Sequence, residues 1–222
     1  EPRPYQIQGV FDALKYNRKL LISPTASGKS LMIYTITRYM VDKGHNVLLV
    51  VPTTSLVEQM YKDFMDYGWN SDENCHRIYA GKDKDTDKPV TITTWQSIYK
   101  LEHSFFKRYG CVIGDEAHLF KSKSLIKIMT KLHDAKYRFG FTGTLDGTQT
   151  HKWVLEGLFG PAYKIIRTDE LISKGHLAKL NIKIILIKHD PQKFDTYEDE
   201  VQFIIQNERR NNFIKKLTLD LK

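Results

Sequence analysis

The sequence predicts an α/β domain with a mostly parallel central sheet flanked by helices. Short apolar runs of strand length alternate with longer stretches whose apolar residues recur at helical spacing. The run 46–51, NVLLVV, is apolar almost throughout, which is typical of a central parallel strand covered on both faces. Polar or acidic loops follow several such runs, and loops at the carboxyl ends of parallel strands form the ligand crevice of these sheets. We therefore expect the functional residues in these loops.

The composition is that of a globular chain with a basic surface. Of its 222 residues, 41% are hydrophobic and 27% are charged, which provides a buried core and excludes a disordered chain. The formal charge of +8 favours a polyanionic partner, nucleic acid first. There is no apolar run of membrane-spanning length and no signal-peptide pattern. We therefore expect a cytoplasmic protein without a membrane partner, or one in the host cytoplasm if a phage encodes it.

The cysteines and histidines do not indicate a disulfide framework or a zinc site. Cys75 and Cys111 lie far apart and form no C-x-x-C motif, so reduced thiols in an intracellular protein are expected. The eight histidines show no H-x-x-x-H spacing around a carboxylate. The sequence therefore favours chemistry that depends on neither feature.

The first expected helix lies within residues 1–18. Pro4 suits a first helical turn, and an apolar stripe at helical spacing is expected to face the core; it consists of Ile7, Val10, Phe11 and Leu14. Gln6 falls off this stripe. Its amide can both donate and accept hydrogen bonds, so it can read the edge of an adenine base.

A strand, a tight loop and a helix follow in the stretch 19–32, KLLISPTASGKSLM. The apolar residues at its start predict the strand, and the small residues after them predict the loop. The helix is expected to run from Lys29 to about Lys43, with Gly44 as its stop. This order of elements is the setting of a phosphate-binding loop.

The residues of this loop suit the binding of a nucleotide. Backbone N–H groups and the positive end of the helix would face an anion. Lys29 would add a full positive charge at the phosphates, and the Ser30 hydroxyl would ligate Mg²⁺. Ser23 stands where the usual pattern of such loops has its first glycine.

The rest of the chain continues the alternation of strands and helices. Ser55 and Glu58 have the spacing of a capping box before the next helix. We expect the later elements in this order: a helix at 56–67, a short strand near 77–81, a strand at 89–94, a short helix at 95–101, strands at 109–116 and 137–141 on either side of a helix at 122–133, and strands at 162–166 and 181–187 on either side of a helix at 168–174. The pattern becomes linker-like from about residue 188 and then helical and charged.

An acidic motif, Asp115-Glu116-Ala117-His118, ends the apolar run that begins at Tyr109. An acid at the end of a parallel strand beside a phosphate loop is how a nucleotide site holds magnesium. Asp115 would hold Mg²⁺ directly or through a water. Glu116 would orient and deprotonate the water that attacks the γ-phosphate, and His118 would lie near the site and sense its state.

The motifs PYQ, SPTASGKS, VPTTSLVEQ, YAGK, TTWQS, DEAH and FTGT, in this order, resemble the first motor domain of superfamily 2 helicases and translocases. The resemblance covers about residues 3–180. It is strongest to the branch of DNA-remodelling motors that includes phage recombination helicases and the motor subunits of restriction enzymes. It implies a RecA-like fold, ATP and Mg²⁺ as cofactors, and movement along nucleic acid bound across two such domains.

The resemblance also implies a role for each motif residue. Gln6 corresponds to the glutamine that reads adenine, with Tyr5 or Arg3 packing on the base. The residues implied to bind the nucleotide are Thr25, Ala26, Ser27, Gly28, Lys29 and Ser30; those implied in catalysis are Lys29, Asp115 and Glu116; and those implied to hold Mg²⁺ are Ser30 and Asp115. The residues implied to couple the ATP state to nucleic acid are His118, Thr142 and Thr144. The residues implied to contact the sugar-phosphate backbone are Pro52, Thr53, Thr54, Gly81, Thr93, Thr94 and Gln96.

Two departures from the family pattern matter. Ala26 and Ser27 stand where the family often has Thr-Gly, which predicts a less pliant loop. The Q-x-x-G-R-x-x-R motif of a second motor domain is not in the sequence. We expect residues 1–190 to form the first motor domain and residues 191–222 to form a linker and the start of a truncated second motor domain. This fragment alone is then expected to bind ATP weakly and hydrolyse it slowly.

The predicted function is that of an ATP-dependent DNA helicase or translocase motor. Its expected substrates are branched or forked DNA, or RNA–DNA hybrids, in recombination, replication or repair. A restriction-enzyme motor subunit and an RNA helicase are the nearest alternatives, and a nuclease domain in the full-length protein would favour the first of these. A small-molecule P-loop kinase is disfavoured by the DEAH tetrapeptide and the threonine-rich loops. A binding module without catalysis is disfavoured because Lys29, Asp115 and Glu116 are all present.

Overall fold

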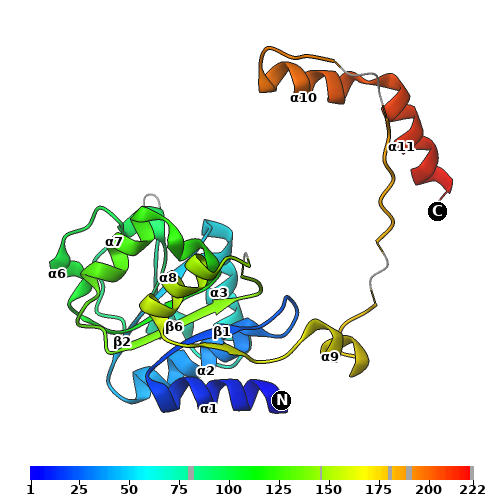
Figure 1. The fold of residues 1–222 in the computed structure, drawn as a ribbon. Helices are drawn as coiled ribbons and strands as arrows, with labels where there is room; N and C mark the ends of the chain where they lie inside the picture. The colour runs from blue at the N-terminus through cyan, green and yellow to red at the C-terminus, as the bar shows by residue number, and fades with distance from the viewer. Residues whose placement is uncertain (80–82, 146, 180–181, 189–191, 221–222) are drawn as a thin grey trace. The chain divides into compact units, whose positions relative to one another are not determined.

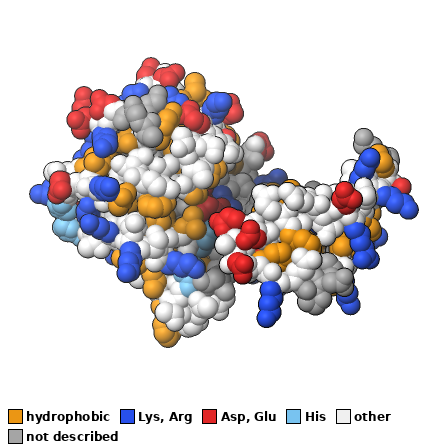
Figure 2. All heavy atoms as spheres, turned by 90° about the horizontal axis from the view of Figure 1, so that it is seen from above, with side chains coloured by type: hydrophobic (Ala, Val, Ile, Leu, Met, Phe, Trp, Pro, Cys, Tyr) orange, Lys and Arg blue, Asp and Glu red, His pale blue; other side chains and the backbone are white. Residues whose placement is uncertain are grey.

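The structure is a computed structural model that describes residues 1–79, 83–145, 147–179, 182–188 and 192–220. The chain divides into two compact units, Glu1–Ala178 and Lys179–Lys222. The first unit is a sheet with helices on both faces (Figure 1). Figure 2 shows lysine and arginine side chains on both units, with acidic side chains among them. No helix within the described residues is long and apolar enough to cross a membrane.

The sheet of the first unit has seven strands in the order β3-β4-β2-β5-β6-β1-β7, and every strand pair is parallel. The predicted α/β class with a mostly parallel central sheet is confirmed. The strands are β1 Arg18–Ile22, β2 Asn46–Val51, β3 Cys75–Ile78, β4 Val90–Thr94, β5 Tyr109–Gly114, β6 Tyr137–Thr142 and β7 Ala162–Lys164.

The helices cover both faces of this sheet. They are α1 Pro4–Tyr16, α2 Lys29–Asp42, α3 Thr54–Asp66, α4 Ser71–Asn74, α5 Trp95–Ile98, α6 His103–Phe106, the 3₁₀ helix η1 Ala117–Lys121, α7 Lys123–Lys131, α8 Gln149–Phe159 and α9 Thr168–Ser173. Buried residues of α1, α2 and α3 share one apolar cluster, and buried residues of α5 to α8 and η1 share the other. The two clusters lie on opposite faces of the sheet.

Strand β2 is apolar almost throughout because both of its faces pack against apolar clusters. Val47, Leu49 and Val51 belong to the cluster with α2 and α3. Leu48 and Val50 belong to the cluster on the other face. Successive side chains of a strand point to opposite faces, so a central strand covered on both sides needs apolar residues at every position.

Two strand glycines let helix α8 approach the middle of the sheet. A Cβ atom at Gly114 would lie 3.0 Å from the ring of Phe159 and 2.7 Å from the ring of Phe120. A Cβ at Gly140 would lie 2.9 Å from the same Phe159 ring. Glycine in a strand interior is typical of such close approaches. These residues fix α8 over β5 and β6, which carry the loops of the candidate site.

Helix α1 buries only part of the apolar stripe that the sequence predicts. Its fully buried residues are Gln6, Gly9 and Ala13, while Val10 and Leu14 of the stripe are partly buried against the same core. A Cβ at Gly9 would lie 3.1 Å from the Ile165 side chain, so small residues set the close approach of the helix. Ile7 and Phe11 of the stripe are exposed.

Helix α3 begins earlier than its predicted cap. The N-cap is Thr53, whose Oγ1 accepts a hydrogen bond from Leu56 N at 3.3 Å. The expected capping box of Ser55 and Glu58 is therefore wrong. Either hydroxyl suits an N-cap, and the sequence pattern did not distinguish the two threonines from the serine that follows them.

The strand expected at 181–187 is wrong for the part that the structure describes. Residues 182–188 form no strand, and Ile184 and Leu186 each expose 83% of their surface. A strand needs a partner for its backbone groups, and the pairings of the described residues give this segment none. The second unit also contains α10 Tyr197–Gln206 and α11 Glu208–Asp220, and neither helix buries a residue.

Candidate nucleotide site and polymer-contact loops

The loops after β1, β5 and β6 meet at the carboxyl edge of the sheet because β6 lies between β5 and β1. Ser23 N donates a hydrogen bond to Thr142 O at 2.8 Å, which joins the first and third loops. A Cβ at Gly143 would lie 3.8 Å from Lys29 Nζ. Asp115 N donates to Val50 O at 2.9 Å, which fixes the acidic loop beside β2. The three predicted motifs therefore lie together.

The predicted phosphate-binding loop is closed by two buried serines. Ser23 and Ser27 are fully buried, and Ser23 Oγ donates to Ser27 Oγ at 2.6 Å. Ser27 Oγ in turn donates to Pro24 O at 2.6 Å. Lys29 Nζ donates to Ser23 O at 3.4 Å, so the lysine lies along the loop. The serine in place of the usual first glycine thus serves the closure of the loop, and Thr25 and Ala26 are exposed at its tip.

The residues expected to read adenine are hydrogen-bonded to this loop. Gln6 is buried, and its Nε2 donates to Ser27 O at 2.9 Å while its Oε1 accepts from Arg3 N at 2.7 Å. The Tyr5 hydroxyl donates to the same Ser27 carbonyl at 2.9 Å, and Arg3 donates to that hydroxyl. A Cβ at Gly28, which has φ of 77°, would lie 2.3 Å from Gln6 Nε2. Gln6 therefore holds α1 against the loop, and its contact with a base stays a prediction.

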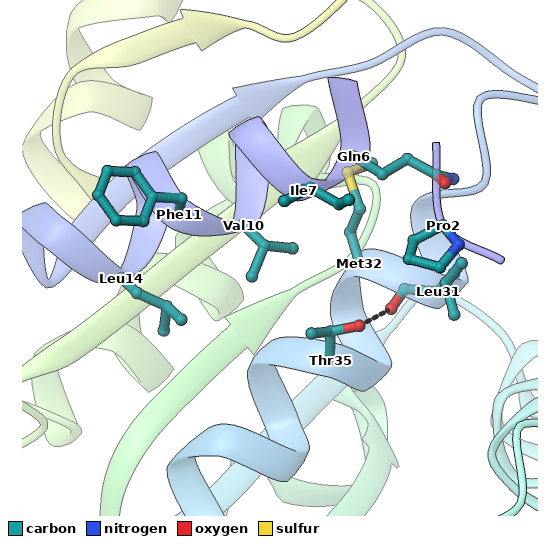
Figure 3. Close-up of a pocket in the computed structure, with 9 residues that line it drawn as sticks. All are labelled: Pro2, Gln6, Ile7, Val10, Phe11, Leu14, Leu31, Met32 and Thr35. Atoms are coloured by element: carbon teal, nitrogen blue, oxygen red, sulfur yellow. Dashed lines mark hydrogen bonds between the residues drawn. The ribbon is translucent and has the colours of Figure 1, made fainter. Parts of the chain in front are cut away.

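An apolar cavity of about 250 Å³ opens beside Gln6, between α1 and α2. Figure 3 shows Ile7, Val10 and Phe11 on the α1 side and Leu31 on the α2 side. Ile7 and Phe11 are the exposed residues of the predicted stripe, and Val10 is partly buried. Phe11 exposes 62% of its surface.

The acidic loop combines a buried carboxyl with a strained neighbour. Asp115 is 8% exposed, and burial raises its pKa to about 6; the nearby Glu116 carboxylate adds to the rise, and Lys29 opposes it. Glu116 adopts a left-handed conformation with φ of 49°, and its N–H donates to Asp115 Oδ1 at 2.9 Å. A buried carboxyl that lacks a full counter-charge fits a cation site.

His118 connects the acidic loop to the loop after β6. Its Nδ1 lies 3.3 Å from Glu116 Oε2 and 3.0 Å from Thr142 Oγ1. Thr142 Oγ1 donates its proton to Thr144 O at 2.8 Å, so it accepts from His118 and the Nδ1 atom carries a proton. The three residues predicted to couple ATP state to nucleic acid are thus in contact, and their coupling role stays a prediction.

Tyr67 makes a contact with Ser30 that the sequence did not predict. Its hydroxyl lies 2.8 Å from Ser30 Oγ, the expected Mg²⁺ ligand. Tyr67 follows α3, 37 residues after Ser30, and belongs to no predicted motif. The contact arises from the packing of α2 against α3, which no local pattern reports.

The residues expected to contact a nucleic-acid backbone divide by exposure. Thr53, Thr54 and Gln96 are exposed, and Pro52 is half-buried. Gly81 lies outside the described residues. Thr93 and Thr94, at the end of β4, are 0% and 5% exposed, and their contact with a nucleic-acid backbone stays a prediction.

The hydroxyls of these two threonines serve the protein itself. Thr93 Oγ1 donates to Ile78 O at 2.9 Å, which ties β4 to β3. Thr94 Oγ1 lies 2.9 Å from Ser97 Oγ at the start of α5. All five residues of β4 are buried, so both of its faces are covered. These hydrogen bonds join β4 to β3 and to the start of α5, the helix that carries Gln96.

One group of potential metal ligands among the described residues lies away from this crevice. It consists of His103, His133 and Asp134, whose ligand atoms lie within 4.8 Å of one another. The two imidazole rings are stacked at 4.7 Å with an angle of 7° between their planes. Lone pairs in parallel ring planes do not converge on one ion, so the group has the geometry of a stacked pair beside an acid.

Comparison with known proteins gives the family. A family model described as "Type III restriction enzyme, res subunit" matches residues 1–147. The chain is 33% identical over 231 residues to the ATP-dependent DNA helicase uvsW of Enterobacteria phage T4, covering 100% of this chain and 46% of that protein. It is 28% identical to the DNA 3'-5' translocase XPB2 of Sulfurisphaera tokodaii, covering 88% of this chain and 43% of that protein. The chain thus spans less than half the length of these curated relatives.

Solved structures agree with this assignment. The crystal structure of the UvsW helicase from bacteriophage T4 matches with a TM-score of 0.68 and 35% identity over 74% of this chain and 60% of that chain. The Pyrococcus furiosus Hef helicase domain matches with a TM-score of 0.64 and 20% identity over 73% of this chain and 37% of that chain, which shows the fold alone. The predicted RecA-like fold and the resemblance to the phage recombination helicase UvsW are confirmed. The chain belongs to the type III restriction enzyme res subunit family and represents the first RecA-like motor domain of superfamily 2 helicases.

Proposed function

We propose that this chain is the ATP-binding motor domain of a DNA helicase or translocase that hydrolyses ATP with Mg²⁺. The observation that carries the proposal is the convergence of three loops at one edge of the sheet: Ser23 bonds to Thr142, and His118 lies between Glu116 and Thr142. The loop predicted to bind phosphate, the acidic pair and the residues predicted to couple are thus in contact, which supports the proposal. A motor needs these three parts together.

The residues of the crevice have complementary roles in this proposal. Backbone N–H groups of the loop and the Lys29 ammonium bind the phosphates. The Ser30 hydroxyl and the Asp115 carboxylate offer hard oxygen donors, which Mg²⁺ prefers. When bound, Mg²⁺ would offset the negative charge of the phosphates. Glu116 orients the attacking water and accepts its proton.

The proposed polymer is DNA, with branched or forked molecules or RNA–DNA hybrids as substrates in recombination, replication or repair. The net charge of +8 and the exposed threonines at the start of α3 support a polyanion contact. The relative identical at 33% is named a DNA helicase, which favours DNA over RNA. We also propose a cytoplasmic location without a membrane partner.

A second motor domain in the same full-length protein belongs to the proposal. The chain covers 46% of its T4 relative, which leaves room for one. Residues 191–222 are proposed as the linker and start of that domain, and the second unit of the structure begins earlier, at Lys179. A restriction-enzyme motor subunit is the second candidate, since the family description names one.

The test is the rate of ATP hydrolysis by the full-length protein with no polymer, single strands, DNA forks and RNA–DNA hybrids. We expect at least one DNA substrate to stimulate hydrolysis, and the best polymer names the substrate class. Lys29→Ala is the control and should abolish nucleotide binding. A rate of ATP hydrolysis that is the same with and without each polymer would contradict the motor assignment. Stimulation only by unbranched duplex, together with a nuclease domain in the full protein, would favour the restriction subunit.

A further inference from the structure

The hydroxyl of Ser30, the proposed Mg²⁺ ligand, has a partner at the end of α3. Ser30 Oγ lies 2.8 Å from the hydroxyl of Tyr67, a distance that fits a hydrogen bond in either direction. Tyr67 belongs to no motif that the sequence predicts.

Either direction of this hydrogen bond leaves the Ser30 oxygen able to bind a cation. A serine hydroxyl has one proton to donate and two lone pairs to accept with. If Tyr67 donates, one lone pair of Ser30 remains, and if Ser30 donates, both remain. The contact therefore orients the Ser30 side chain and keeps at least one lone pair for a cation.

Tyr67 is itself held firmly in place. Its N–H donates to Asp63 O at 2.9 Å, and its carbonyl accepts from the Tyr34 hydroxyl at 3.2 Å. Its ring packs against the ring of Tyr34, with 5.1 Å between the centroids. Backbone and ring are therefore both anchored to α2. A hydroxyl on such an anchored ring can orient its partner.

We propose that Tyr67 is a positioning residue for Mg²⁺ binding, and that its hydroxyl holds Ser30 with a lone pair free for the ion. This inference rests on the proposed function, because that function assigns Ser30 to Mg²⁺. The same helix begins at Thr53, in the loop expected to contact nucleic acid. Helix α3 thus joins the polymer loop at one end to the metal ligand at the other.

The test is the Mg²⁺ dependence of nucleotide binding, followed by fluorescence of a methylanthraniloyl derivative of ATP on the whole chain. Tyr67→Phe keeps the ring and removes the hydroxyl. We expect it to raise the Mg²⁺ concentration for half-maximal binding about fivefold, the effect of one ordinary hydrogen bond. Binding in EDTA should stay unchanged. Tyr39→Phe is the matched control, since it removes the hydroxyl of an exposed tyrosine near the other end of α2, and it should leave the Mg²⁺ dependence unchanged.

A double-mutant cycle separates positioning from general damage. Ser30→Ala should raise the Mg²⁺ requirement more than Tyr67→Phe, and adding Tyr67→Phe to Ser30→Ala should change nothing further. An unchanged Mg²⁺ requirement in Tyr67→Phe overturns the inference. So does a lowered one, because Tyr67 would then hold Ser30 away from the ion. If the unmutated chain shows no Mg²⁺-dependent nucleotide binding, the proposed function fails. If the unmutated chain shows such binding and Tyr67→Phe leaves the Mg²⁺ requirement unchanged, the inference alone fails.

Discussion

The nucleotide crevice and the polymer-contact loops lie at the carboxyl edge of one sheet, yet they use polar side chains in different ways. In the crevice, Ser23, Ser27 and Thr142 are fully buried, and each is hydrogen-bonded to a neighbouring loop or to its own. In the polymer loops, Thr53 and Gln96 are exposed. The buried polar groups fix the geometry of the proposed phosphate site, whereas the exposed ones are accessible to the proposed polymer.

Buried and exposed polar side chains should also respond differently to substitution. Removing a buried hydroxyl lowers the free energy of unfolding, because its former hydrogen-bond partner stays buried and unpaired. An exposed side chain exchanges its partner for water at little cost. Substitutions in the crevice should therefore lower stability and nucleotide binding together, and substitutions in the exposed loops should lower polymer binding alone.

The largest effect on stability is expected from Gly28→Ala. The new Cβ would lie 2.3 Å from Gln6 Nε2 at a φ of 77°, so it combines a clash with a strained backbone. We expect a loss of about 3 kcal/mol in the free energy of unfolding, measured in urea, and at least about tenfold weaker nucleotide binding. Gly44→Ala is the matched control: its φ is 80° with no atom within 4 Å of the new Cβ, so only the strain of about 1 kcal/mol should appear. Equal losses would contradict the role of Gln6.

A smaller effect is expected from Thr93→Val. This change keeps the shape of the side chain and removes its hydrogen bond to Ile78 O. We expect a loss of about 2 kcal/mol in the free energy of unfolding, because a buried carbonyl loses a partner. Thr54→Val, at an exposed position, should cost less than about 0.5 kcal/mol. If the Thr93→Val protein has normal stability but binds DNA poorly, the result would indicate that Thr93 contacts DNA directly.

The smallest effect on stability is expected from Gln96→Ala. The side chain is exposed at α5, so the free energy of unfolding should change by less than about 0.5 kcal/mol. Binding of the full-length protein to single-stranded DNA should weaken about threefold, as for the loss of one exposed hydrogen bond to phosphate. Gln8→Ala, also exposed, is the control and should leave binding unchanged. Equal binding by both variants would remove Gln96 from the proposed interface.

Much of the fold and the crevice could be predicted because the responsible patterns are local. The continuous apolar run of β2 predicts a central strand, and the stretch from Ser23 to Ser30 contains both the turn and the start of the next helix. Burial by distant elements could not be predicted. Thr93 is buried because helices cover its strand, and Tyr67 reaches Ser30 because α2 packs on α3.

Two predictions depend on packing partners that a local pattern does not report. Val10 and Leu14 of the α1 stripe pack against the core as predicted, but Ile7 and Phe11 stay exposed. The apolar run at 182–188 has the composition of a strand, and the pairings of the described residues give it no partner. In both segments the sequence predicts an apolar surface but not which distant element would cover it.

The most direct test of the central claim is ATP hydrolysis and ATP binding by Glu116→Gln in the full-length protein with DNA present. Glutamine keeps the size of the side chain and the backbone N–H that donates to Asp115, but it cannot accept the proton of the attacking water. We predict a fall of at least about 100-fold in kcat with nucleotide affinity within about twofold of the unmutated protein. Hydrolysis at the normal rate would contradict the assignment of this crevice as the site of ATP hydrolysis.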